Sequence, residues 1–68
     1  MEFHERIRAL RKELNESQVK TAEAIGVTPR QYLRFEKGEQ KPGFDNLIAM
    51  ADHFGVTLDY LMCRTDER

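Results

Sequence analysis

The sequence has few residues that could cross-link a small protein. Cys63 is its only cysteine, so no disulfide can form within the chain. With His4 and His53 it completes the set of soft metal ligands, and the three are too far apart to match a short metal-binding motif. We therefore expect neither a disulfide nor a metal site, and the sequence indicates no cofactor.

Long apolar runs are also missing. No segment approaches the ~20 apolar residues that span a bilayer. The N-terminal stretch MEFHERIRALRK lacks the apolar core and the cleavage site of a secretory signal. Together with the single thiol, these absences lead us to expect a cytoplasmic protein that does not bind membranes.

No combination of residues suggests catalysis. The sequence offers no Ser-His-Asp set, no paired carboxylates and no glycine-rich loop for a phosphate. A chain of 68 residues forms one small domain, and a domain of this size rarely encloses a substrate cleft. We therefore predict that the protein is not an enzyme, and we expect no small-molecule ligand.

The formal net charge at pH 7 is only -1, whereas nucleic-acid-binding domains are usually basic. The charge is unevenly distributed, however. Residues 1–41 carry nine Lys and Arg against seven Asp and Glu, and residues 42–68 carry two against five. Since salt screens each charge beyond about 10 Å, a basic surface in the first part can still attract a polyanion.

Apolar residues recur at helical spacing along most of the chain. A first amphipathic helix is predicted over residues 3–14, where the apolar positions are Phe3, Ile7, Leu10 and Leu14. Ser17 can cap a second, short helix through its hydroxyl, and Gly26 can end that helix in the left-handed conformation.

The third predicted helix has the clearest start. Thr28 can cap it, and Pro29 fits the first helical position, where no N–H is missed. Gln31 stands three residues after the cap and completes a Thr-x-x-Gln capping box. Gly38 ends this helix.

A polar loop over residues 39–43 precedes a fourth helix over residues 44–54. Its apolar positions are Phe44, Leu47, Ile48, Ala51 and Phe54. Thr57 can cap a fifth, short helix. The sequence therefore predicts an all-α fold, a compact five-helix bundle with a central helix-turn-helix, in one domain over residues 1–63 with a frayed tail over residues 64–68.

The two sides of the third predicted helix differ in chemistry. At ~100° per residue, Tyr32, Phe35 and Glu36 fall on one side. The opposite side carries three cations, Arg30, Arg34 and Lys37. Such a stripe suits the DNA major groove, where arginine can donate to both O6 and N7 of guanine. Cationic helix faces are more often merely solvated, but a capped helix directly after a short helix and a tight turn favours DNA binding.

The sequence resembles the phage-repressor-like (Xre-type) helix-turn-helix regulators from about Ile7 to Leu61. Three segments carry the resemblance: RALRKELNESQ, AEAIGVTPRQYLRFEKGEQKP and NLIAMADHFGVTLDYLM. The resemblance implies a sequence-specific transcriptional regulator of double-stranded DNA, which we interpret as a repressor that reads the major groove with its third helix.

The resemblance also implies roles for individual residues. Base contacts are expected from Pro29, Arg30, Gln31, Leu33 and Arg34. Phosphate contacts are expected from Gln18, Thr28, Lys37, Gln40 and Lys41. The residues that match Arg11 and Glu36 form a buried ion pair in this family, which explains a carboxylate among aromatic residues.

Several positions depart from the family pattern. Pro29 can offer a base only apolar contact, and Gln31 can be used for the capping box instead of a base. Leu33 stands where a small polar residue is usual; it can meet a thymine methyl group, which we favour, or simply be tolerated there. Thr21 stands where a buried leucine is usual, so the core around the second helix is expected to be thin or slightly rearranged.

The fifth predicted helix carries more apolar side chains than one small core needs. They are Leu58, Tyr60, Leu61 and Met62. The resemblance implies a homodimer through this helix, formed in solution or only on DNA. Three alternatives stay open: packing of these side chains in the core, a protein-interaction adaptor or antitoxin that docks a partner through the same helix, and a regulator that also activates through Glu23 or Glu39.

Overall fold

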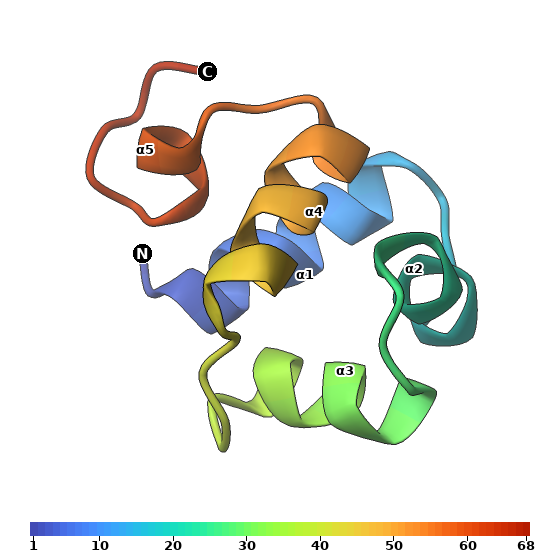
Figure 1. Cartoon of the computed structure of the whole chain (residues 1–68). Helices are drawn as coiled ribbons and strands as arrows, with labels where there is room; N and C mark the ends of the chain where they lie inside the picture. Colours follow the sequence, from blue (N-terminus) through green and yellow to red (C-terminus); the bar gives the residue numbers. More distant parts are fainter.

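The structure, a computed structural model, describes residues 1–68 and contains five α-helices and no strand. The helices are α1 (Phe3–Glu13), α2 (Gln18–Ile25), α3 (Pro29–Lys37), α4 (Phe44–Phe54) and α5 (Leu58–Leu61). The prediction of an all-α, five-helix fold is confirmed. Figure 1 shows α1 behind α4, with α2 to one side, α3 along the lower edge and α5 at the opposite corner. None of the helices has the length and apolar character needed to cross a membrane.

Side-chain hydroxyls cap three of the five helices. Ser17, Thr28 and Thr57 each accept a hydrogen bond from the amide three residues ahead, at 3.0–3.1 Å. Each bond satisfies a helix-terminal N–H that has no partner inside the helix. Only one of the two hydrogen bonds of the capping box predicted for α3 is present. The Gln31 side chain does not accept a hydrogen bond from the Thr28 amide, so that part of the prediction is wrong.

Glycines end α2, α3 and α4 in the left-handed conformation. The φ angles of Gly26, Gly38 and Gly55 are 83°, 74° and 69°, respectively. Their N–H groups donate back to the last turn of each helix. An L-residue with a side chain adopts this conformation at a cost of about 1 kcal/mol or more. The three glycines therefore set the tight turns that redirect the chain.

We expect Gly26→Ala to lower the free energy of unfolding by about 1 kcal/mol. A Cβ atom at Gly26 would meet nothing within 4 Å, so only the backbone conformation contributes. Gly38→Ala should cost more, because its Cβ would lie 3.2 Å from Nδ1 of His4 and the ring would have to move. Chemical denaturation of both variants measures the difference, and equal losses would show that His4 moves at no cost.

Ten apolar side chains contributed by all five helices form the core: Ile7, Leu10, Ala22, Ile25, Tyr32, Phe35, Met50, Ala51, Phe54 and Leu61. The apolar positions predicted for α1 and α4 are correct only in part. Leu14 and Ile48 are exposed, and Phe44 is 71% exposed. Met50, which was not predicted, is fully buried instead.

A buried arginine joins α1 to the end of the chain. The Nη1 of Arg6 donates to the backbone oxygen of Tyr60 at 2.8 Å, and its guanidinium lies 3.9 Å from the centroid of the Tyr60 ring. Near the C-terminus, Asp66 pairs with Arg6 at 3.4 Å and Arg68 pairs with Glu13 at 2.9 Å. The predicted fraying of the tail would break these last two contacts.

The helix-turn-helix consists of α2 and α3, which pack against each other across the turn at Gly26. α1 also contacts α3, while α4 contacts α2 and α5. α3 is thus supported from two neighbouring helices and lies at the edge of the molecule (Figure 1). This placement leaves one side of α3 free of contacts with the rest of the fold.

Candidate nucleic-acid interface

The two sides of α3 differ in burial as they do in chemistry. Tyr32, Phe35 and Glu36 are each 0% exposed, so the predicted inward side is confirmed. The opposite side is exposed and carries Arg30, Arg34 and Lys37, which we call the cationic stripe. None of these three cations forms an ion pair within the chain. Their charges are therefore free to meet a polyanion.

The other candidate base contacts lie around the cationic stripe. Pro29 is exposed in the first turn of α3. Gln31 and Leu33 are half-buried, so less of each side chain can reach a ligand. Leu33 lies close to one turn from both Arg30 and Lys37 and thus on their side of the helix.

The candidate phosphate contacts lie near the two ends of α3. Thr28 is exposed at its start, while Lys37, Gln40 and Lys41 are exposed at its end and in the loop that follows. Gln18 is half-buried at the start of α2. Its side-chain nitrogen donates a hydrogen bond to Oε1 of Glu36 on α3 at 3.2 Å. The structure therefore brings residues from α2, the turn and the loop to the ends of the same helix.

Glu36 lies at the centre of a polar network on the inner side of α3. Arg11 donates from Nε to its Oε2 at 2.7 Å and from Nη2 to its Oε1 at 3.1 Å. Gln18 donates to the same Oε1, and the Nε of Arg8 lies 3.7 Å from it. A two-armed arginine contact of this kind fixes orientation as well as charge. α1 and α2 together therefore fix the rotation of α3.

The polar network keeps the Glu36 carboxyl group ionised. Burial alone would raise the pKa of Glu36, but hydrogen bonds, led by that from Arg11, outweigh burial, and the pKa lies below its usual value. Burial raises the pKa of the Tyr32 hydroxyl, which is enclosed beside Glu36 without a hydrogen bond of good geometry. The arrangement is a fixed ion pair between helices and offers no group poised for proton transfer.

Sequence reasoning missed a second polar cluster, which joins α2 to α4. The Oε1 of Glu16 accepts a hydrogen bond from the Thr21 hydroxyl at 2.7 Å and lies 2.7 Å from Nε2 of His53. Thr21 is fully buried, and Glu16 satisfies its hydroxyl. Glu16 and His53 are 37 residues apart in sequence, so no local pattern could pair them.

We expect the free energy of unfolding to fall in acid as Glu16 is protonated. The hydrogen bond from His53 is the main cause that lowers the pKa of Glu16 in the folded protein. A lowered folded-state pKa contributes stability that is complete above the unfolded value of ~4.3 and disappears as the pH falls through the folded value. Thermal unfolding of the parent chain and of His53→Ala between roughly pH 6 and pH 3 measures this contribution. The variant should lose less stability over that interval, and parallel curves would contradict the assignment.

The structure divides the four residues predicted for a dimer interface. Leu61 is 0% exposed and belongs to the core of its own chain, so its assignment to an interface is wrong. Tyr60 is half-buried beside Arg6. Leu58 and Met62 are 39% and 40% exposed, which leaves both accessible to another chain.

A family model described as helix-turn-helix matches residues 7–61. RstR, the transcriptional repressor of the cryptic phage CTXphi in Vibrio cholerae serotype O1 (strain ATCC 39315 / El Tor Inaba N16961), is 36% identical over 69 residues, covering 98% of this chain and 62% of RstR. AnsR, an HTH-type transcriptional regulator of Bacillus subtilis (strain 168), is 33% identical over 64 residues, covering 94% of this chain and 55% of AnsR. The chain therefore spans 55–62% of the length of these two relatives.

Solved structures share the arrangement of the five helices. The P22 c2 repressor in complex with a synthetic operator is 32% identical with a TM-score of 0.87, covering 91% of this chain and 94% of that one. A transcriptional regulator from Listeria innocua is 30% identical with a TM-score of 0.87, covering 98% of this chain and 63% of that one.

Proposed function

Since the chain belongs to the helix-turn-helix family, matched over residues 7–61, we propose that it is a sequence-specific regulator of transcription that binds double-stranded DNA. It acts as a repressor, with α3 in the major groove. One observation carries this proposal: the cationic stripe is exposed while the opposite side of α3 is fully buried. A helix held in this way can enter a groove ~12 Å wide without giving up its core contacts.

The relatives support the same function. The P22 c2 repressor was crystallised with a synthetic operator, and RstR is a transcriptional repressor. Each match covers more than nine-tenths of this chain. The proposal includes a cytoplasmic location and DNA as the main partner, with neither a catalytic role nor a cofactor.

Arg30 and Arg34 are the main base contacts in this proposal. Both are exposed, and arginine recognises guanine by donating to O6 and N7. Pro29 and Leu33 add apolar contacts, which suit thymine methyl groups. Gln31 is half-buried and contributes least, although its side chain is not tied up in a capping box.

Phosphate contacts at both ends of α3 fix its register on the duplex. Thr28 and Lys37 serve at the two ends of the helix, and Gln40 and Lys41 serve in the loop that follows. Gln18 contributes from α2, where its bond to Glu36 also orients it. Contacts of this kind give affinity without sequence preference.

Selection of bound sites from random double-stranded DNA at about 50 mM salt tests the function. We expect one enriched motif of two inverted half-sites about one helical turn apart. The control is the double variant Arg30→Ala with Arg34→Ala, which should remain folded because both side chains are exposed, yet should enrich no motif. Absent binding, or binding without any preference, would overturn the proposal.

A homodimer would bring two copies of α3 to successive major grooves, about 34 Å apart. The exposed Leu58 and Met62 support such a contact through the α5 end of the molecule. We expect Leu58→Asp to reduce two-site DNA binding while the monomer stays folded, with Leu14→Asp, directly after α1, as the exposed control. Sedimentation with and without DNA measures the stoichiometry. Unchanged dimerisation of the Leu58 variant would place the interface elsewhere.

The same exposed side chains support a second candidate, a protein-interaction adaptor or antitoxin that docks a partner through α5. In that case Leu58→Asp should abolish capture of one stoichiometric partner, and Arg34→Ala should leave capture unchanged. A DNA regulator should lose DNA binding with Arg34→Ala, whereas an adaptor should not depend on Arg34, so this variant separates the two functions.

A further inference from the structure

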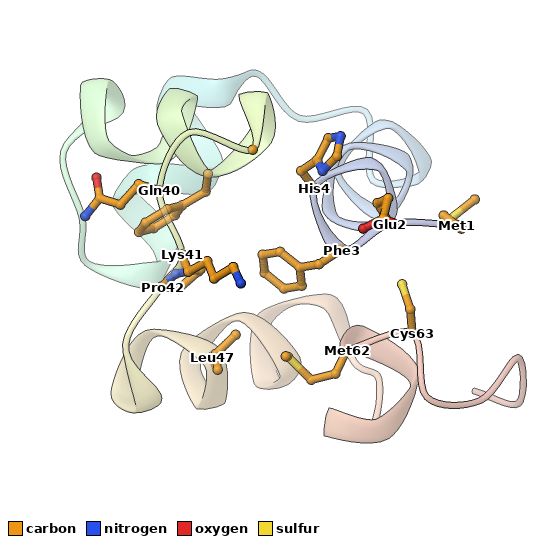
Figure 2. A pocket seen from close by; sticks show the side chains of 12 residues that line it. Met1, Glu2, Phe3, His4, Gln40, Lys41, Pro42, Leu47, Met62 and Cys63 are labelled. Carbon is orange, nitrogen blue, oxygen red and sulfur yellow. The ribbon is translucent and has the colours of Figure 1, made fainter.

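One cavity of about 500 Å³ opens beside the loop that follows α3. Figure 2 shows it between the start of α1, that loop, α4 and the end of α5. Apolar side chains from these segments form most of its wall: Phe3, Phe35, Pro42, Leu47 and Met62. Small-molecule sites typically measure roughly 300–1,000 Å³ and have apolar walls. The volume of this open cavity lies within that range.

The charged side chains in the wall are Glu2 and Lys41, and neither forms an ion pair within the chain. The Glu2 carboxylate accepts the backbone amide of Glu5 in a capping box at the start of α1, so it is already engaged. The ring of His4 packs against Gly38. Lys41 forms no ion pair, and Figure 2 shows its side chain reaching from the loop towards the cavity. The cavity thus combines an apolar interior with a free ammonium at its edge.

We propose that this cavity binds an apolar monocarboxylate, with the hydrocarbon part against the walls and the carboxylate paired with Lys41. Contact with Phe3, Leu47 and Met62 removes hydrocarbon from water, which is the main source of affinity. The ammonium selects the anionic head group, since a neutral molecule leaves it unpaired and a cation is repelled. A fatty acid of medium chain length is the simplest member of this class.

Such a ligand also regulates DNA binding, an inference that rests on the proposed function. Lys41 is one of the proposed phosphate contacts, and an ammonium held by a bound carboxylate cannot also neutralise a phosphate. The ligand should therefore weaken binding to all sequences alike. It should also lower the slope of log affinity against log salt concentration by about one, the contribution of one phosphate contact.

Titration of the free chain with butanoate, hexanoate, octanoate and decanoate, followed by NMR, tests the site without DNA. We expect saturable shifts at Phe3, Leu47 and Met62. Affinity should rise about fourfold with each added methylene until the cavity is filled. Octanol, which has the same chain length as octanoate but no charge, should bind roughly fivefold more weakly. Equal affinity for octanol and octanoate would overturn the assignment of Lys41, and the absence of saturable shifts would overturn the site.

Two matched pairs of variants locate the ligand. Lys41→Gln should abolish the preference for octanoate over octanol, whereas Lys37→Gln, an exposed lysine outside the cavity, should keep it. Leu47→Ala should weaken the binding of decanoate several-fold. Ile48 does not line the cavity, so Ile48→Ala should leave the affinity for decanoate unchanged. Equal effects within either pair would show that the ligand binds elsewhere.

The two inferences fail separately. If the chain binds carboxylates but no DNA sequence, the proposed function falls and the ligand site stands. If it binds an operator whose affinity decanoate does not change, the regulatory step is overturned.

Discussion

Arg11→Met is expected to lower the free energy of unfolding by about 3 kcal/mol, because the Glu36 carboxylate would stay buried without its two-armed partner. The free energy of unfolding of small domains is often only about 5 kcal/mol, so the variant would lose much of the protein's stability. The measurement is urea denaturation followed by circular dichroism. The midpoint should fall strongly while the slope with urea stays the same.

The double variant Arg11→Met with Glu36→Leu provides the decisive control. Removing both charges leaves no carboxylate stranded in the interior, so the double variant should be more stable than Arg11→Met alone. Arg8→Met should cost less than Arg11→Met, because Arg8 is half exposed and lies 3.7 Å from the carboxylate. Additive losses in the double variant would show that the ion pair contributes no coupling energy.

Arg34→Ala is expected to weaken binding to the preferred DNA site by about 1–3 kcal/mol, or roughly 5- to 150-fold. Arg34 is exposed and unpaired, so the loss reflects a contact with DNA and leaves the fold intact. Gel-shift titration against a set of single-base-pair variants of the site measures the effect. Preference should relax at one base pair and persist at the others.

Lys41→Ala provides the contrast for that experiment. Lys41 is a proposed phosphate contact, so its removal should weaken binding to all DNA sequences by the same factor. The slope of log affinity against log salt concentration should fall by about one. If Arg34→Ala also weakened every sequence equally, Arg34 would be a backbone contact and the base-contacting assignment would move to Arg30.

The helix ends could be predicted from the sequence because their causes are local. A hydroxyl three residues before an amide, as at Ser17, Thr28 and Thr57, acts within one turn. A glycine that must adopt positive φ, as at Gly26, acts at a single residue. The two sides of α3 followed from helical geometry for the same reason.

The burial of individual apolar residues was harder to predict. Ile48 and Met50 lie on the same helix, yet only Met50 is buried, because the positions of neighbouring helices such as α2 and α5 decide which part of α4 is covered. Leu61 fills the core although α5 has only 4 residues, too few for a periodic pattern to define an inner side.

Contacts between distant charged residues could not be predicted from periodicity at all. Arg6 donates to the backbone of Tyr60, 54 residues away, and Glu16 meets His53. Arg11 and Glu36 were paired only through the family resemblance, and the structure has them in contact at 2.7 Å. Contacts of this kind depend on how the helices pack together, and the pattern of residues along one helix does not show that packing.

The complete separation between the anchored and the outward halves of α3 has an evolutionary consequence. The fully buried side chains of the helix are Tyr32, Phe35 and Glu36, whereas Arg30 and Arg34 are exposed and form no ion pair. Substitutions at the two arginines can therefore accumulate without a penalty in folding. A lineage carrying this domain could exchange one target for another through a few point mutations while its architecture stays constant.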